Sequence, residues 1–127
     1  RIVESGSFKS FSKDERRAYD APFPSKKYKA GTRAFPALVP TTPDNPASAA
    51  TKSAWKVLEN WHKPFLTAFS NGDPSTRGGD RYMQKRSPGA KGLKHVTLKG
   101  GHFLQEDSGT EFAEAVNNLL QTIKNPT

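Results

Sequence analysis

The chain has 127 residues, of which only 33% are hydrophobic, and it contains 10 glycines and 10 prolines. This composition is lean for a core that must be stable by itself, so we expect the chain to be part of a larger protein. The absence of cysteine excludes disulfides, thiolate metal ligands and cysteine nucleophiles, and it is compatible with a cytoplasmic location.

The charge is strongly basic, with 20 Lys and Arg residues against 12 Asp and Glu residues, a net charge of +8. The basic residues are scattered, without a tight cluster or interleaved stacking aromatics, and no helix-turn-helix, RNP or zinc pattern accompanies them. We therefore expect a solvated surface and no nucleic-acid partner. No apolar run reaches transmembrane length, so we expect no membrane partner. The chain opens on Arg1 rather than Met, which again suggests a fragment.

The first 62 residues favour short helices joined by proline-rich connections. Ser12 and Glu15 form a capping box, which predicts a helix from Lys13 to about Asp20. A second short helix is expected over residues 25–33, followed by an apolar island at residues 35–40. A third helix is expected from about Ser48, with one buried face made by Ala54, Val57, Leu58 and Trp61. We interpret residues 1–62 as part of a helical cap domain.

From Lys63 onward the pattern changes to strand, helix, strand, helix. The expected strands cover residues 65–69 and 93–98, and a short helix over residues 76–86 connects them. A final helix is expected from Ser108, with a second capping box to Glu111, to a point before Pro126. Its predicted buried face contains Phe112, Val116, Leu119, Leu120 and Ile123. The fold class is α/β, and residues 63–127 are interpreted as part of its core, whose other strands come from elsewhere.

Each expected strand runs into a turn that contains glycine and presents one titratable side chain. Asp73 follows the first strand, and His102 follows the second strand after two glycines. In a parallel sheet these turns lie at the carboxyl ends of the strands, where active sites are built. Acid first and histidine second is the order of the last two triad members in α/β-hydrolases. We predict His102 as a general base and Asp73 as the acid that orients it.

Other titratable residues are weaker candidates for this chemistry. Asp80 falls inside the predicted helix, and Asp107 precedes the last helix, where the helix dipole alone favours an acid. His62 and His95 are interpreted as structural. The three histidines lack metal-ligand spacing, so no metal and no cofactor is expected.

Four stretches of sequence carry a resemblance to a known family. They are Phe69-Ser-Asn-Gly-Asp73-Pro-Ser-Thr-Arg-Gly-Gly-Asp80, Gly100-Gly-His102-Phe-Leu-Gln-Glu-Asp107, Ala21-Pro-Phe-Pro24 and Ala34-Phe-Pro-Ala-Leu-Val-Pro40. Together they resemble haloalkane dehalogenases, and most of all the subgroup whose catalytic acid is an Asp after the penultimate core strand. The resemblance implies the C-terminal portion of an α/β-hydrolase fold, namely a remnant of the helical cap and the last two parallel strands with their helices.

The resemblance also implies a two-step displacement that detoxifies small halogenated hydrocarbons. An Asp carboxylate displaces the halide to form an ester, and water activated by the histidine hydrolyses that ester. His102 then matches the base, Asp73 the acid, and Phe35, Pro36 and Val39 the lining of the apolar substrate cavity.

The sequence departs from the family pattern in one respect. No position matches the nucleophile or the halide-binding groups, so the partner implied is the rest of the hydrolase core, and the chain is expected to be inactive alone. Trp55 and Trp61 are interpreted as packing residues.

Three alternatives remain open at this stage. An epoxide hydrolase or another α/β-hydrolase would share the His and acid pair, and Tyr19 and Tyr28 lie in the cap region where epoxide hydrolases carry tyrosines. A non-enzymatic basic binding module and a catalytically inert scaffold are the others.

Overall fold

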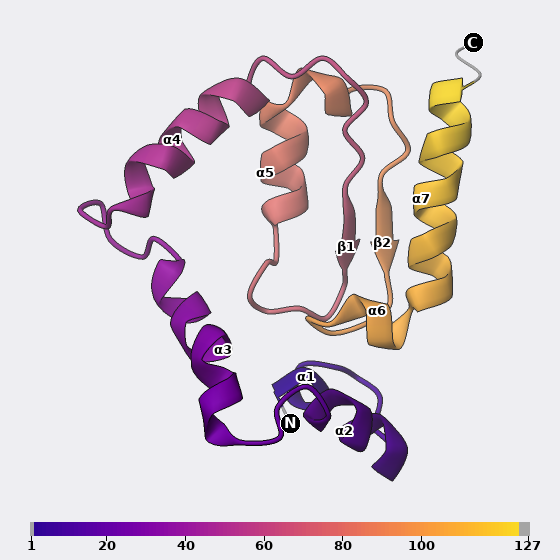
Figure 1. The fold of residues 1–127 in the computed structure, drawn as a ribbon. Coiled ribbons are helices and arrows are strands. Elements are labelled where there is room, and N and C mark those ends of the chain that lie inside the picture. The colour runs from indigo at the N-terminus through magenta and orange to yellow at the C-terminus, as the bar shows by residue number, and fades with distance from the viewer. Residues whose placement is uncertain (1, 125–127) are drawn as a thin grey trace. The chain divides into compact units, whose positions relative to one another are not determined.

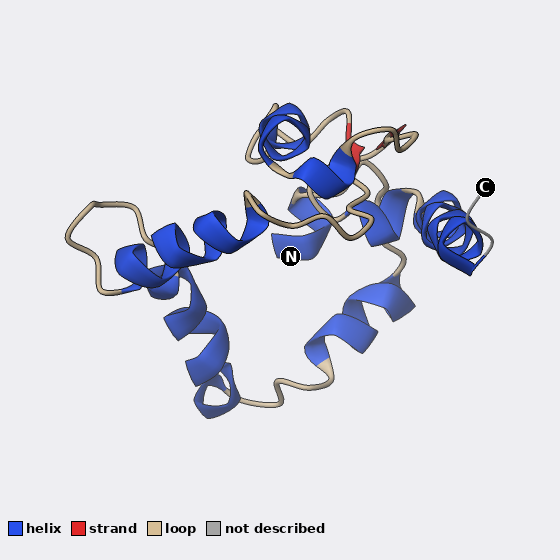
Figure 2. Cartoon of the chain, turned by 90° about the horizontal axis from the view of Figure 1, so that it is seen from above, coloured by secondary structure: helices blue, strands red, loops and turns tan. Residues whose placement is uncertain are grey.

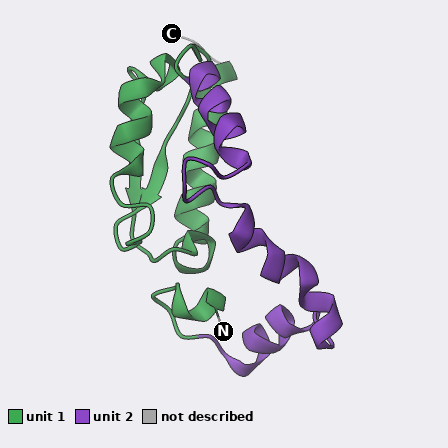
Figure 3. Ribbon diagram, turned by 90° about the vertical axis from the view of Figure 1, so that its left-hand side faces the viewer, with its two compact units in different colours: residues 1–10, 59–127 green, residues 11–58 purple. Residues whose placement is uncertain are grey.

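The computed structural model describes residues 2–124, which contain helices and two short strands (Figure 1). The chain divides into two compact units (Figure 3). One unit consists of residues 11–58, and the other combines residues 1–10 with residues 59–127. The N-terminal ten residues therefore group with the second half of the chain, whereas the sequence placed them with the cap.

The unit of residues 11–58 is helical, as the sequence predicts (Figure 2). The capping box forms, since the Ser12 hydroxyl accepts from the Glu15 N–H at 3.2 Å and the Glu15 carboxylate accepts from the Ser12 N–H at 2.7 Å. The helices of this unit are α2 (Lys13–Asp20), the 3₁₀ helix η1 (Lys26–Lys29), α3 (Ala30–Ala34), the 3₁₀ helix η2 (Phe35–Leu38) and α4 (Ala47–Leu58).

The predicted buried face of α4 is wrong for this structure. The helix ends at Leu58, before Trp61, and Val57 is 61% exposed. No residue of α4 is buried. The prediction failed because hydrophobic periodicity identifies an apolar face but does not show that another element covers it.

The other unit contains a parallel strand pair, which confirms the predicted orientation. Strand β1 (Ala68–Ser70) pairs with β2 (Val96–Leu98), with Ala68 opposite Val96 and Ser70 opposite Leu98. In Figures 1 and 2 the strand pair stands between helices α5 and α7. The helical elements of this unit are α1 (Ile2–Ser5), α5 (Gly79–Arg86), the 3₁₀ helix η3 (Pro88–Ala90), α6 (Leu104–Asp107) and α7 (Gly109–Lys124).

Both strands are shorter than predicted because a side chain interrupts the ladder. The Thr67 N–H donates to the His95 imidazole Nδ1 at 3.1 Å, and the Phe65 N–H donates to the Gly89 carbonyl at 3.0 Å. Regular pairing therefore starts only at Ala68. Beyond the strands, pairing continues into the turns, where the Asn71 N–H donates to the Leu98 carbonyl at 2.9 Å.

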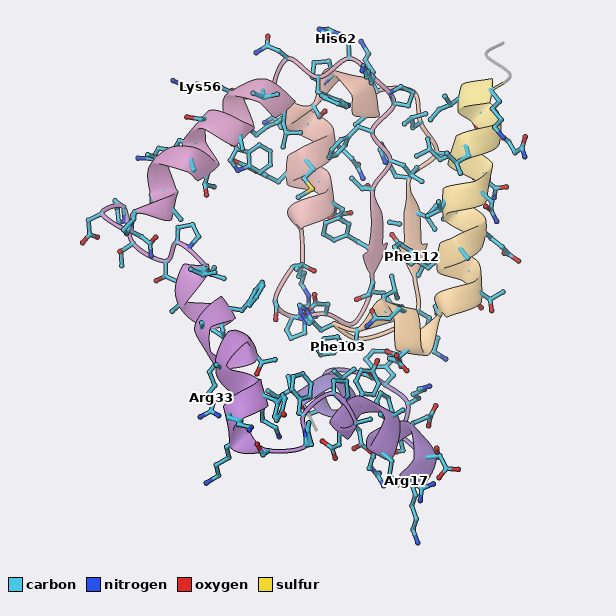
Figure 4. All side chains as sticks on the ribbon, viewed as in Figure 1. Arg17, Arg33, Lys56, His62, Phe103 and Phe112 are labelled. Atoms are coloured by element: carbon cyan, nitrogen blue, oxygen red, sulfur yellow. The ribbon has the colours of Figure 1, made fainter. Side chains whose placement is uncertain are left out.

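The final helix lies where the sequence predicts it, although its start and its burial differ. The Ser108 hydroxyl donates to the Lys99 carbonyl at 2.6 Å instead of forming the predicted capping box, and Pro126 lies outside the described residues. The buried residue of α7 is Ala115, while Phe112 is 38% and Leu120 48% exposed. Figure 4 shows Phe112 on the side of α7 that faces the strands. Two strands are too narrow to cover this helix face, so the predicted burial is wrong for the chain by itself.

No helix within residues 2–124 combines the length and the apolar character needed to cross a membrane.

Candidate active site

The two predicted site residues lie in adjacent turns at the carboxyl ends of β1 and β2. The turns are joined by backbone hydrogen bonds, since the Gly72 N–H donates to the Gly100 carbonyl at 3.0 Å. The Asn71 side-chain oxygen also accepts from the Gly100 N–H at 3.2 Å. Parallel pairing thus continues past the strands and holds the acid turn against the histidine turn.

Asp73 and His102 form the pair that the sequence predicts. The imidazole Nδ1 lies 3.0 Å from the Asp73 Oδ2. The Asp73 side chain is 5% exposed and that of His102 is 47% exposed, so the pair has a buried carboxylate and an accessible ring. Because a carboxylate accepts from Nδ1–H, the neutral imidazole carries its proton on Nδ1. Its Nε2 then has a free lone pair, which is the arrangement that a general base requires.

The Asp73 carboxylate is fixed by further hydrogen bonds from its own turn. Its Oδ1 accepts from the Ser75 N–H at 2.8 Å, and its Oδ2 accepts from the Thr76 hydroxyl at 2.5 Å. Burial alone would raise the pKa of Asp73, but the hydrogen bonds from Thr76, His102 and Ser75 outweigh it and lower the pKa to about 2. Asp73 is therefore ionised at every pH at which a histidine base works.

Replacing Thr76 with valine is expected to raise the pKa of Asp73, because Thr76 donates the shortest hydrogen bond to its carboxylate. A depressed folded-state pKa stabilises the fold above the unfolded value near 3.8, and this stability is lost as the pH falls through about 2. The contribution is on the order of 2 kcal/mol. In urea titrations, the Thr76→Val protein should be less stable than Thr76→Ser, which keeps the hydroxyl, at pH 6, and this difference should shrink as the pH falls through 3.8 towards about 2. Equal stability of the two variants at every pH would show that the Thr76 hydroxyl does not lower the pKa of Asp73.

Asp107, one of the two rival acids, has a different set of partners. Its Oδ2 accepts from the Gly101 N–H at 2.8 Å, and its Oδ1 accepts from the Lys9 N–H at 3.0 Å. The carboxylate therefore binds backbone rather than serving as a helix-dipole partner. Asp80, the other rival, lies in the first turn of α5. The carboxylate bonded to the His102 ring is that of Asp73.

Sequence reasoning missed the N-terminal residues that surround His102. A cavity of about 390 Å³ is lined by His102 and Asp73 together with Ile2, Phe8 and Phe103. Phe103 lies beyond the carboxyl ends of the strands (Figure 4) and meets the His102 ring edge-on, with 5.0 Å between ring centroids. The cavity therefore places the apolar side chains of Ile2, Phe8 and Phe103 in the same lining as His102. The pair of glycines before His102 is the one sequence feature that could have indicated this contact, because glycine also permits the close approach of another backbone.

The other histidine near the strands has both ring nitrogens occupied. The Thr67 N–H donates to the His95 Nδ1, so the ring proton is on Nε2, which donates to the Ala90 carbonyl at 3.0 Å. His95 thus links two turns and has no nitrogen left for proton transfer. No group of acidic or histidine side chains within residues 2–124 could hold a metal ion.

The predicted cavity-lining residues lie in the unit of residues 11–58. Phe35 and Pro36 belong to η2, and Val39 follows it. Phe35 is 71% and Val39 58% exposed, so these apolar side chains are available to line a cavity, and that role stays a prediction.

The chain is similar in sequence to several known proteins. The chain is 53% identical over 119 residues to a haloalkane dehalogenase from Psychrobacter cryohalolentis, covering 93% of this chain and 39% of that protein. It is 48% identical over 116 residues to one from Mycobacterium marinum, covering 91% and 39%. It is 50% identical over 121 residues to haloalkane dehalogenase 1 of Mycobacterium tuberculosis, covering 95% and 40%.

These comparisons confirm the resemblance found in the sequence. The chain spans about two fifths of the length of these relatives and matches their C-terminal part. No model of a protein family matches the chain.

Proposed function

We propose that this chain is the C-terminal part of an α/β-hydrolase that cleaves carbon–halogen bonds of small haloalkanes to give an alcohol and a halide ion. The observation that carries the proposal is the 3.0 Å contact between Asp73 and His102 at the carboxyl ends of neighbouring parallel strands. Relatives named haloalkane dehalogenases at 46–53% identity support it. In this assignment residues 1–62 contribute to the helical cap and residues 63–127 to the core, with the first ten residues grouped with the core segment in this structure.

The chemistry proposed for the complete enzyme has two steps. In the first, an Asp carboxylate outside this chain attacks the carbon that bears the halogen, the carbon–halogen bond breaks, and the halide leaves with the bonding electrons. In the second, the His102 Nε2 removes a proton from water, and the resulting hydroxide attacks the carbonyl carbon of the ester. Collapse of the tetrahedral intermediate breaks the ester C–O bond, releases the alcohol and regenerates the carboxylate, and the imidazolium then gives its proton to solvent.

The environment of each residue suits its proposed role. Asp73 is buried and ionised, so it holds the Nδ1 proton and stabilises the imidazolium that forms in the second step. The His102 ring is half exposed, which lets water reach Nε2. Phe35, Pro36 and Val39 are proposed to line a desolvated cavity, in which an apolar substrate binds and the carboxylate nucleophile becomes more reactive.

The exposed apolar surface of the chain supports its incorporation into a larger sheet. Phe112, Val116, Leu120 and Ile123 recur at helical spacing on α7, and each is at least 38% exposed. We propose that the preceding part of the hydrolase core covers this face and pairs with the free edge of β1, because an isolated two-stranded sheet is marginal in water.

The test is to sequence the gene upstream of the Arg1 codon, express the full-length protein and measure halide release. We expect equal amounts of bromide and alcohol at the start of reaction with 1,2-dibromoethane, and chloride from 1-chlorobutane, while residues 1–127 alone release none. Full-length protein that releases no halide but converts an epoxide to a diol would instead indicate an epoxide hydrolase. A serine at the nucleophile position would indicate an ester hydrolase.

A further inference from the structure

The Asp107 carboxylate joins two segments that are about a hundred residues apart in the chain. Its Oδ1 lies 2.9 Å from the Phe8 N–H and 3.0 Å from the Lys9 N–H. Its Oδ2 lies 2.9 Å from the Phe8 N–H and 2.8 Å from the Gly101 N–H. One carboxylate therefore satisfies three backbone donors, two from the N-terminal segment and one from the residue immediately before His102.

The N-terminal segment also contacts the histidine turn directly. The Gly6 carbonyl accepts from the His102 N–H at 2.7 Å and from the Phe103 N–H at 3.3 Å. The fit is so close that a Cβ atom at Gly101 would lie 2.2 Å from the Gly6 oxygen, and one at Gly100 would lie 2.9 Å from the Asp107 Cβ. Neither glycine has a positive φ, so both are needed for close approach and not for the tight turn that the sequence suggested.

The charge state of Asp107 strengthens its hydrogen bonds to these backbone N–H groups. Burial by itself raises the pKa of the carboxyl, but the N–H groups of Gly101, Phe8 and Lys9 lower it below its usual value. The side chain is thus a carboxylate near neutral pH, and its hydrogen bonds to N–H groups are charge-assisted.

We propose that Asp107 is a positioning residue for His102. It acts through Gly101 and the N-terminal segment, which together fix the backbone on both sides of the His102 Cα, and it does not touch the reacting atoms. This proposal rests on the proposed function, in which the imidazole must meet one water molecule at the ester. A shift of about 1 Å in such a group can cost 10²-fold in rate.

The primary test uses Asp107→Asn in the full-length protein, because asparagine keeps the size of the side chain but turns an NH₂ group toward backbone donors. We expect hydrolysis of the alkyl-enzyme ester to slow by about 10- to 100-fold, while the first halide is released at the wild-type rate in single-turnover experiments. The matched control is Glu106→Gln, which removes the neighbouring carboxylate that pairs with Lys9 at 3.2 Å and should leave both steps unchanged.

A second variant tests the close contact between Gly101 and the Gly6 carbonyl without altering a charge. Gly101→Ala places a methyl group against the Gly6 oxygen and should slow the same step as Asp107→Asn. Gly109→Ala is the control, because a Cβ at Gly109 meets no atom within 4 Å. Equal slowing of both chemical steps, or unchanged rates in folded Asp107→Asn and Gly101→Ala proteins, would overturn the proposal.

A spectroscopic measurement separates failure of this proposal from failure of the proposed function. With ¹⁵N-labelled histidine and glycine, the wild-type His102 ring should show the Nδ1–H tautomer imposed by Asp73, and the amides of Gly101 and His102 should exchange slowly. Asp107→Asn should mix the tautomers and speed exchange, whereas Glu106→Gln should not. If the wild type releases no halide, the proposed function fails, but these signals still decide whether Asp107 positions His102. Unchanged signals in Asp107→Asn would refute it.

Discussion

Replacement of His102 by alanine or glutamine in the full-length enzyme is expected to stop the reaction after one halide per active site. Displacement of halide by a carboxylate requires no proton transfer, whereas hydrolysis of the resulting ester requires an activated water. The second step should slow by about 10²- to 10⁴-fold, the usual contribution of a general base. Mixing the variant with 1,2-dibromoethane should therefore give a stoichiometric burst of bromide and an Asp-linked adduct detectable by mass spectrometry.

The control for this experiment is His95→Gln. His95 has both ring nitrogens in hydrogen bonds to Thr67 and Ala90, so its replacement should lower stability without trapping the ester. Multiple turnovers in the His102 variants, or an adduct in the His95 variant, would show that His102 is not the base.

Replacement of Asp73 by asparagine is expected to slow the same hydrolytic step by on the order of 10²-fold, the lower end of the general-base range. The amide keeps the size of the side chain but loses the charge that stabilises the imidazolium, and its NH₂ group no longer enforces the Nδ1–H tautomer. The imidazole remains present, so the loss should be smaller than in His102→Ala. Pre-steady-state halide and alcohol measurements separate the two steps.

Asp80→Asn is the matched variant, because it removes an acid from the same stretch of sequence in the first turn of α5. It should leave ester hydrolysis at the wild-type rate. A larger loss from Asp80→Asn than from Asp73→Asn would reassign the acid.

The sequence was sufficient to predict the Asp73 and His102 geometry because both residues follow β-strand patterns and stand in local turns. Parallel strands bring their carboxyl ends to the same edge of a sheet, so two short patterns implied a contact across 29 residues. The helix over residues 13–20 was equally local, since Ser12 and Glu15 satisfy its first N–H groups.

The remaining features depended on contacts that no short pattern records. The ladder starts at Ala68 rather than Phe65 because the Thr67 N–H bonds to the ring of His95, which is 28 residues away. Burial of Phe112 and Val57 was predicted from periodicity, but periodicity only identifies a face that needs a partner. The sequence pattern explains Asp107 through the helix dipole alone, because no local motif indicates that Phe8 and Lys9 lie beside it.

The long separation between Phe8 and Asp107 has a consequence for how the protein folds during synthesis. Residues 6–9 leave the ribosome about a hundred residues before their partners at 101–107, and translation adds roughly 5–20 residues per second. For on the order of 5–20 s, therefore, the Gly6 carbonyl has no N–H donor from the histidine turn. Over the same time the Phe8 and Lys9 amides lack the Asp107 carboxylate that accepts from them. Asp73 meets His102 after a much shorter delay. The nascent chain thus brings Asp73 and His102 together once β2 has emerged. Residues 6–9, which were synthesised much earlier, then close over this pair.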